Sequence, residues 1–510
     1  MNRPGLIERT IEAISPTWAA ARARGRAQAA AYRQAYEAVE QTHLRQQQQD
    51  KGSGNAIVSM TAAALRNHAR HLDRNHDIIS GGLSTLVTWI VGAHGINVVP
   101  QPRDLDGNIV ESVVDQIMPV YRAWSKRPEV TWQHDWPSAQ RLLVRTWLRD
   151  GEALLQELVG LVPFLEHGSA VPYSLELIEP DMVPLDMDDS ERRILQGIEA
   201  NAWGRPTVYH VYKRHPGDPD VFVAETKRVP ASLIRHLRIV NRINQRRGES
   251  ILASTFTRVE DLKDYEESER IAAKIGASMA AAIIKGDPQA YDPDKPAKRP
   301  PAMRMQPGMI FDNLAPGERV EMIDPNRPNP NLEPYRNGQL RAVSSPMRLS
   351  FSALSRNYNG TYSAQRQELV ESHGAIGVLA AEVINAIVRP VYERLIATAV
   401  VSGEIALPRG VTLATAVDAE YYAPPMPWIN PVHESIGLRT QVRSGFKTMS
   451  EVLAERGKRM YETIEQLRNE RAWAQSQGVV LDSDPAQTSA AGVSQFDANT
   501  PAANPQEAPQ

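Results

Sequence analysis

The sequence predicts an α+β fold that is mainly helical, and three patterns along the chain predict it. Between Ala56 and about Leu165, the apolar residues recur at the spacing of an α-helix. Between Ser174 and Leu237 the period changes to two, which is typical of β-strands. Beyond about Thr257, helical patterns return and continue almost to the C-terminal tail. A chain of 510 residues can hold two or three domains, or one large domain with insertions.

The composition is ordinary for a soluble globular protein, with 42% hydrophobic and 23% charged residues. A formal net charge of -3 does not suggest a surface that binds nucleic acid throughout. The chain has no cysteine, which excludes disulfides, thiolate zinc sites and cysteine nucleophiles and fits assembly in a reducing cytoplasm. Charges near the N-terminus predict no signal peptide. The most apolar stretch, 376–401, carries Glu382, Arg389, Glu393 and Arg394, so we expect no membrane-spanning helix.

Residues 1–54 are rich in Ala, Arg and Gln and predict an arm on the outside of the fold. The region after this arm carries helical stripes of apolar residues. One stripe is Leu83, Leu86, Val87 and Ile90, and another is Val113, Ile117, Tyr121 and Trp124. Six of the nine tryptophans lie between Trp89 and Trp203, so we expect the best-packed core in this part.

The strands are expected around Leu175 and Leu177 and around Val208, His210 and Tyr212. The run His-Pro-Gly-Asp-Pro-Asp at 215–220 is a turn signal. It predicts a hairpin that joins 208–213 to 221–226.

A long helix is expected over 257–285. Its first half is acidic, which suits the positive end of a helix dipole, and its second half is small and apolar. Residues 286–334 hold 11 of the 37 prolines, which predicts an irregular or edge-strand module, since proline removes backbone donors. This module lies between the long helix and a second helix, about 333–348. It is either a projecting contact surface or a flexible loop.

A polar loop over 352–363 then leads into a long helix over 364–401, with a kink predicted at Pro390. A short β segment is expected around 411–423, and helices over 434–477. The tail from about 482 to 510 is Ala, Pro, Ser, Gln and Asn with almost nothing to bury, which predicts disorder.

Enzyme motifs are missing from the sequence. The only Gly-Lys pair, Gly457-Lys458, has Val452 where a phosphate-binding loop needs its first glycine, and Arg459 follows it. The chain has no G-x-S-x-G elbow and no H-E-x-x-H helix. These absences argue against a nucleotide-driven motor, a hydrolase and a protease.

Two clusters contain residue types that can bind a metal ion. His68, His71 and His76 lie near Asp73 and Asp77, and imidazoles with carboxylates can bind a divalent ion, but a solvated polar helix has the same composition. The acidic run Asp186, Asp188, Asp189 and Glu191 has no basic or histidine partner nearby and is better explained as an exposed turn. We therefore expect no metal and no cofactor.

Two stretches together resemble the portal proteins of the lambda-like phage family. Leu354, Ser355, Tyr358, Tyr362, Ser363 and Arg366 are similar to a family pattern Leu-Ser-x-x-Tyr-x-x-x-x-Tyr-Ser-x-x-Arg, with one residue fewer between the tyrosines. Residues 73–102 resemble the family's Arg-Asn-x-x-x-x-x-Gly followed by an apolar helix. The histidines at 71 and 76 depart from the family's pattern. Weaker similarities lie at 177–183, 249–269 and 427–434, so the resemblance covers roughly residues 60–475 in the family's order.

The resemblance implies a portal fold with wing, stem, clip and crown regions. The implied boundaries are a wing at 55–256, stem helices at 257–285 and 333–350, a clip at 286–332, a tunnel loop at 351–363, a wing helix and β segment at 364–426, crown helices at 427–480 and a disordered tail at 481–510.

The implied function is that of a head-tail connector in the virion, assembled in the host cytoplasm and not an enzyme. It is a homo-oligomeric ring, usually of twelve subunits, at one capsid vertex. Double-stranded DNA passes through it, and terminase, the major capsid protein and a head-tail adaptor are its partners, with no membrane.

A conduit must pass DNA without holding it, so a near-neutral or acidic lining is expected. We hypothesise that the loop residues touch DNA transiently and that the first half of the long helix presents an acidic face to the channel. The loop residues are Arg356, Asn357, Tyr358, Asn359, Thr361 and Tyr362, and the acidic face is Glu260, Asp261, Asp264 and Glu267.

Two other classes stay open from the sequence. A metal-dependent nuclease or packaging enzyme would use the carboxylates or the histidines. A monomeric or dimeric adaptor would use the proline-rich module to bind a partner and would form no ring.

Overall fold

The computed structural model describes residues 52–221, 225–277, 281–284, 319–322, 329–425, 430–479 and 481. The chain divides into two compact units, Met1–Ala56 and Ile57–Gln510, and the elements below belong to the second except for the start of the first helix. Almost all of residues 1–54, most of the proline-rich module at 286–332 and nearly all of residues 481–510 lie outside the described residues.

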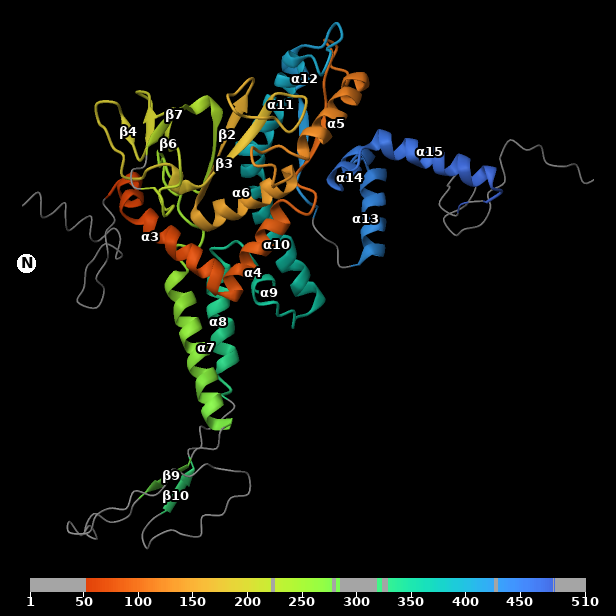
Figure 1. Ribbon diagram of the computed structural model, residues 1–510. Coiled ribbons are helices and arrows are strands. Elements are labelled where there is room, and N and C mark those ends of the chain that lie inside the picture. Colours follow the sequence, from red (N-terminus) through yellow and green to blue (C-terminus); the bar gives the residue numbers. More distant parts are fainter. Residues whose placement is uncertain are drawn as a thin grey trace, which may run out of the picture. The chain divides into compact units, whose positions relative to one another are not determined.

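The described part of the chain mixes helices and antiparallel sheets, with helices in the larger share, as the sequence predicts (Figure 1). The first helices are α3 (Gly54–Asn75), α4 (Asp77–Ile90), α5 (Glu111–Ser125) and α6 (Trp136–Asp150). Both predicted stripes are confirmed: Leu83, Leu86 and Ile90 are buried on α4, and Val113, Ile117 and Trp124 on α5.

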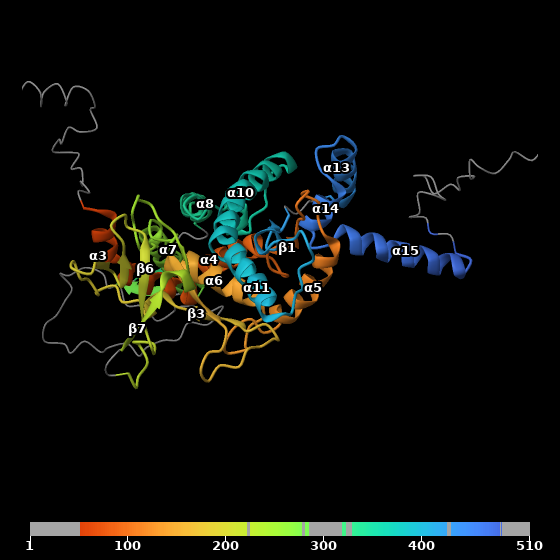
Figure 2. The same cartoon turned by 90° about the horizontal axis from the view of Figure 1, so that it is seen from above.

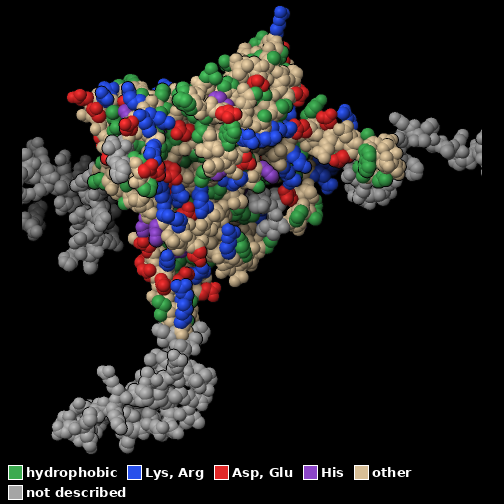
Figure 3. Space-filling model, in the orientation of Figure 1, with side chains coloured by type: hydrophobic (Ala, Val, Ile, Leu, Met, Phe, Trp, Pro, Cys, Tyr) green, Lys and Arg blue, Asp and Glu red, His purple; other side chains and the backbone are tan. Residues whose placement is uncertain are grey.

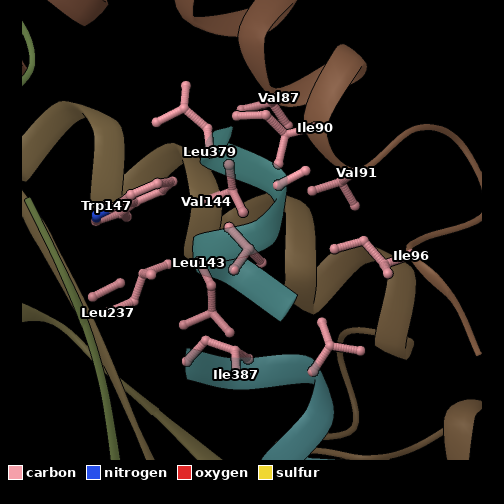
Figure 4. Close-up of a cluster of buried hydrophobic side chains, with 14 of the residues drawn as sticks. Val87, Ile90, Val91, Ile96, Leu143, Val144, Trp147, Leu237, Leu379 and Ile387 are labelled. Atoms are coloured by element: carbon pink, nitrogen blue, oxygen red, sulfur yellow. The ribbon is translucent and has the colours of Figure 1, made fainter. Parts of the chain in front are cut away.

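One large hydrophobic core joins these helices to the second half of the chain. Figure 4 shows Ile90 of α4, Leu143 and Trp147 of α6, and Leu379 and Ile387 meeting in it. Three of the six tryptophans in the predicted core region, Trp124, Trp136 and Trp147, are almost completely buried. By contrast, Trp203 is 93% exposed, at a hairpin tip.

Two separate sheets cover the central part of the sequence. The first has the order β3-β2-β8, from β2 (Glu152–Val159), β3 (Tyr173–Ile178) and β8 (Ile234–Arg238). The second has the order β4-β5-β6-β7, from β4 (Ile194–Leu195), β5 (Ile198–Ala200), β6 (Pro206–Tyr212) and β7 (Thr226–Pro230). The predicted hairpin is confirmed, since Tyr212 pairs with Thr226, although its second strand begins later than expected.

The helical pattern that was expected to reach Leu165 ends at Asp150. Gly151 has a φ of 91°, a left-handed conformation that closes α6, and strand β2 follows directly. Six consecutive residues of β2 are buried, so the strand shows none of the alternation that identifies a half-exposed strand.

Two further strands replace the end of the long helix. Helix α7 runs from Phe256 to Ala277, and β9 (Ala281–Ile284) then pairs antiparallel with β10 (Arg319–Met322). The helix expected to reach Lys285 is therefore shorter. Because β9 and β10 lie far apart in the sequence, no local pattern of residues predicts their pairing.

Helix α8 (Leu332–Ser344) packs beside α7. The rings of Tyr265 and Tyr335 are 4.6 Å apart, and Arg336 Nε lies 2.6 Å from Glu266 Oε1. Helix α7 buries Val259 and Leu262 only near its start, so most of the α7 surface that faces away from α8 is exposed.

After α9 (Phe351–Ser355), α10 (Tyr362–Val383) and α11 (Arg389–Ser402) form one helical run (Figure 2). A kink is predicted at Pro390, and the structure has a π-helical turn, Ile384–Val388, that ends two residues before this proline. Proline cannot donate to the preceding turn, and the wider turn accommodates the lost hydrogen bond.

By length and composition, Tyr362–Ser402 is the one helix among the described residues that could cross a membrane. The charges noted in the sequence therefore do not exclude a span by themselves. However, Ile376, Leu379, Val383 and Ile387 belong to the hydrophobic core, so the run is a core helix here.

The C-terminal elements follow the predicted order, except that a short helix occupies part of the β segment expected at 411–423. They are α12 (Leu413–Ala416), β11 (Ala419–Tyr422), α13 (Pro431–Arg443), α14 (Met449–Glu455) and α15 (Met460–Ser476). Strand β11 pairs with β1 (Asn97–Pro100), and Asn97 Nδ2 donates to the Ala454 carbonyl, which ties α14 to the core.

A charge network lies beneath the first sheet. Glu152, on β2, is completely buried and accepts hydrogen bonds from Arg66, Arg247, His236 and the Gly248 amide. Burial alone would raise the pKa of Glu152, but the charge of Arg247, the hydrogen bond from His236 and the charge of Arg66 outweigh burial and hold the pKa well below its usual range. Glu152 is therefore ionised at neutral pH and binds α3, β2, β8 and the 247–248 segment together.

Candidate nucleic-acid interface

The loop between α9 and α10 is shorter than the sequence predicts. Phe351–Ser355 is a helical turn, started by Ser350 and buried at Ala353 and Leu354. Residues 356–361 alone form the open loop. The apolar side chains of Ala353 and Leu354 pack into the core, which is why the beginning of the expected loop is helical.

Local hydrogen bonds fix the shape of this loop. The Asn359 amide donates to Asn357 Oδ1 at 3.0 Å, and the Gly360 amide donates to the Tyr358 carbonyl at 2.9 Å. Gln365 also donates to the Tyr358 carbonyl, and Thr361 caps α10 by accepting from the Ala364 amide. Two of the six predicted loop residues, Asn357 and Thr361, therefore help to build the loop, a role that sequence reasoning missed.

The exposed side chains of the loop are mostly neutral. Tyr358 is 56% exposed and Tyr362 is 59% exposed, with Asn359 exposed between them. Arg356, the single cation proposed here, has a φ of 58°, and its Nη2 donates to Thr85 Oγ1 of α4 at 2.8 Å. That bond ties the guanidinium to α4 and leaves the tyrosines and Asn359 as the projecting groups.

The four predicted acidic residues of α7 are all exposed. Glu260, Asp264 and Glu267 follow the i, i+4, i+7 spacing and share one helical face, with Asp261 beside it. Glu260 Oε1 lies 3.0 Å from His68 Nε2, and Glu267 lies 3.4 Å from Arg270. Among the residues that the structure describes, Asp261 and Asp264 have no ion pair.

Basic side chains also lie on the same helix pair, as Figure 3 shows where red and blue side chains adjoin. Lys263 and Arg270 are exposed on α7 beside the acidic residues. Over Phe256–Ala277 the sequence has six acidic and four basic residues, so the helix is mildly acidic and not a strong anionic surface. Helix α8 packs on both α7 and α9, so it links the helix that carries the acidic residues to the helical turn that precedes the loop.

The histidine cluster does not assemble into a metal site. His68 faces Glu260, His71 Nδ1 contacts Asn75 at 3.2 Å, and Asp73 is bound by Arg145. His76 is buried at the start of α4, and burial lowers its pKa, so its ring is neutral. The acidic run at 186–191 forms a turn, as expected, in which Asp189 accepts from two backbone amides. The expectation that it has no basic partner nearby is wrong, since Arg192 Nε lies 3.9 Å from Asp189 Oδ2.

One group that the sequence did not suggest has its ligand atoms close together, namely Glu179, Asp181 and His215. Asp181 is already bound by Arg66 and Arg70, which supply the positive charge that a metal ion would. His215 Nδ1 accepts from the Gly217 amide, so Nε2 carries the proton and cannot act as a ligand. This chemistry does not fit a metal site.

Comparisons with known proteins agree with the family that the sequence resembles. The family model described as phage portal protein, lambda family, matches residues 40–378. A curated relative, the probable portal protein of Halomonas phage phiHAP-1, is 21% identical over 424 residues, which is 80% of each chain.

Among solved structures, a chain from the neck of the native gene transfer agent particle, computed with C12 symmetry, is 12% identical, with a TM-score of 0.46. The match covers 78% of this chain and 97% of that chain. A chain from the virion of the native gene transfer agent particle has a TM-score of 0.43 at 12% identity, covering 79% of this chain and 98% of that one.

The sequence comparisons define the class, which is that of phage portal proteins, structural components rather than catalysts. The family model spans more than half of the sequence, and the chain therefore belongs to the lambda family of phage portal proteins.

Proposed function

We propose that this chain forms a closed ring with copies of itself at one vertex of a phage capsid, and that double-stranded DNA enters and leaves through the ring. Membership of the portal family carries this proposal. In assembly terms, a closed ring needs one heterologous contact repeated around an axis. Terminase, the major capsid protein and a head-tail adaptor are the proposed partners, with assembly in the host cytoplasm before the ring enters the virion.

The proposed regions follow the elements of the fold. The wing comprises 55–256 together with the α10–α11 run and β11. Helices α7 and α8 form the stem, and the clip lies between them, with β9 and β10 at its base. Helices α13, α14 and α15 form the crown, and the loop 356–361 faces the channel.

The ring is tested by native mass spectrometry together with negative-stain images of the purified chain, whose mass is 56.6 kDa. We expect a particle with a central hole and a mass near twelve chains. A chain that stays monomeric or dimeric at micromolar concentration, also with its capsid partners present, would contradict the ring and favour an adaptor.

The loop is proposed to touch DNA transiently through Tyr358, Asn359 and Tyr362, because these are its projecting polar groups. Hydroxyl and amide groups can hydrogen-bond phosphate oxygens without trapping the polymer by charge. The acidic face of α7 has the complementary role of keeping phosphates from binding to the wall.

Replacing Tyr358 and Asn359 together with alanine is expected to lower the yield of DNA-filled particles about fivefold, since a lost contact is worth about 1 kcal/mol. The measurement is the ratio of full to empty particles at equal ring content. The matched control replaces Tyr461 and Asn469 on α15, where the tyrosine is 60% exposed. Equal ratios for the two double variants would remove the loop from the proposal.

A further inference from the structure

A cavity of about 570 Å³ lies where the segment after α14 meets the core helices. Its floor is apolar and aromatic and includes Val91, Ile96, Tyr121 and Trp136. No role in the proposed conduit uses this cavity. A site of this size and lining is typical of one that takes a large apolar side chain or a short peptide segment.

Gln140 is a polar group in this lining without a full set of partners. The residue is 1% exposed, and its Oε1 accepts from the Ile96 amide at 3.0 Å. Its Nε2 is buried and has no hydrogen-bond partner among the described residues. A buried donor left unpaired is costly, so this amide favours an occupant that brings an acceptor such as a backbone carbonyl.

The rim of the cavity is cationic. Arg122, Arg456, Lys458 and Glu455 line it. Arg122 is paired with Glu462 at 3.0 Å and Arg456 with Glu434, so Lys458 is the one cation of this lining without an ion pair among the described residues. Glu455 is itself paired with Lys447 at 2.6 Å. An occupant with negative charge around an apolar group would therefore fit best.

The two end segments of the chain differ in the charge they could bring to this rim. Residues 482–510 contain Asp482, Asp484, Asp497 and Glu507 and no lysine or arginine. Their only aromatic residue is Phe496. Residues 1–51 have eight basic and five acidic residues, so their net charge is positive and Lys458 would not attract them. Charge complementarity selects the C-terminal tail.

The tail can also reach the cavity within one chain. Lys458 on the rim lies just before α15, whose 17 residues span about 25 Å. From Leu481 to Phe496 an extended chain covers up to about 50 Å. The tail can therefore run back along α15.

We propose that the acidic C-terminal tail docks in this cavity of its own chain, with the Phe496 ring against the partly exposed Tyr121 and the neighbouring carboxylates at Lys458. The site is a built-in peptide-binding site for the tail. Docking of the tail does not depend on the ring or on DNA passage, so its test is independent of the test of the proposed function.

Because the chain has no cysteine, engineered cysteine pairs report the docking directly. In the full-length chain, Ser125→Cys, at the cavity, is combined with Gln495→Cys and treated with a short bis-maleimide. The control pairs Gln495→Cys with Ser112→Cys, at the other end of α5 and about 20 Å away along the helix. We expect the first pair to crosslink about tenfold faster, because docking raises its effective concentration.

Two further variants test the chemistry of the contact. Phe496→Ala is expected to slow the Ser125 crosslink to the rate of the control pair. Lys458→Glu should slow it about threefold and Lys458→Arg should leave it unchanged, as expected for an exposed charge contact. Ser112 and Lys458 are exposed and Ser125 is half-buried, so these changes are expected to leave the fold intact.

Denaturing gels separate the outcomes. Crosslinking within one chain leaves a monomer band and supports the proposal. Three results would each overturn it. They are equal crosslinking rates for the Ser125 and Ser112 pairs, a Ser125 crosslinking rate that Phe496→Ala leaves unchanged, and a dimer band from crosslinks between chains.

Discussion

Replacing Arg247 with methionine is expected to lower the free energy of unfolding by about 3–5 kcal/mol, because it leaves a buried carboxylate without its main partner. Arg247 is completely buried and binds Glu152 through two nitrogens, with Nε at 2.9 Å and Nη2 at 2.6 Å from Oε1. Its remaining donors bind the carbonyls of Pro180, Val183 and Gln196 at 2.9–3.1 Å. Methionine has a similar length but donates to none of them.

The measurement is urea unfolding at one fixed protomer concentration, since assembly would otherwise change the apparent stability. The matched control is Arg228→Met. Arg228 also makes a two-bond pair, with Glu199, but its side chain is 63% exposed. An exposed pair of this kind is worth about 1 kcal/mol or less. If the two variants lose the same stability, the network around Glu152 is not the constraint inferred here.

This network also marks a limit of sequence reasoning. Glu152 and Arg247 lie 95 positions apart, and neither stands in a motif. Only the packing of α3, β2 and β8 brings Arg66, Arg247 and His236 to one carboxylate. Amphipathic stripes such as Leu83–Ile90 could be predicted because they depend on neighbours along the same helix. The burial of ions depends on partners from distant segments.

The same distinction explains the errors in the elements. Strand β2 is buried on both faces, so its apolar residues do not alternate with polar ones, and β9 exists only through its pairing with β10. Tyr358 and Tyr362 match a family pattern, Asn359 lies in the loop between them, and all three side chains are exposed. The hydrogen bond that ties Arg356 to Thr85, by contrast, spans 271 positions and could not be predicted from the loop itself.

Replacing Trp124 with alanine is expected to cost about 3–5 kcal/mol of unfolding free energy, whereas the same change at Trp203 should cost about 0.5 kcal/mol or less. Trp124 is completely buried between Tyr173 and Trp136, with ring centroids at 5.7 and 5.5 Å. Its Nε1 donates to the Tyr173 carbonyl at 3.1 Å, so alanine creates a cavity and also removes the hydrogen bond to a buried acceptor.

Trp203 lies in the same tryptophan-rich region but is 93% exposed, so removing its side chain loses little buried apolar area. Both variants are unfolded in urea at the same protomer concentration, with the slope of the transition checked for a change in the denatured state. The comparison tests whether the tryptophans of this region are clustered because they fill the core. If Trp124→Ala were as mild as Trp203→Ala, the region from Trp89 to Trp203 would not be the main core. In that case the stability of the chain would have to come from the α10–α11 run and its contacts.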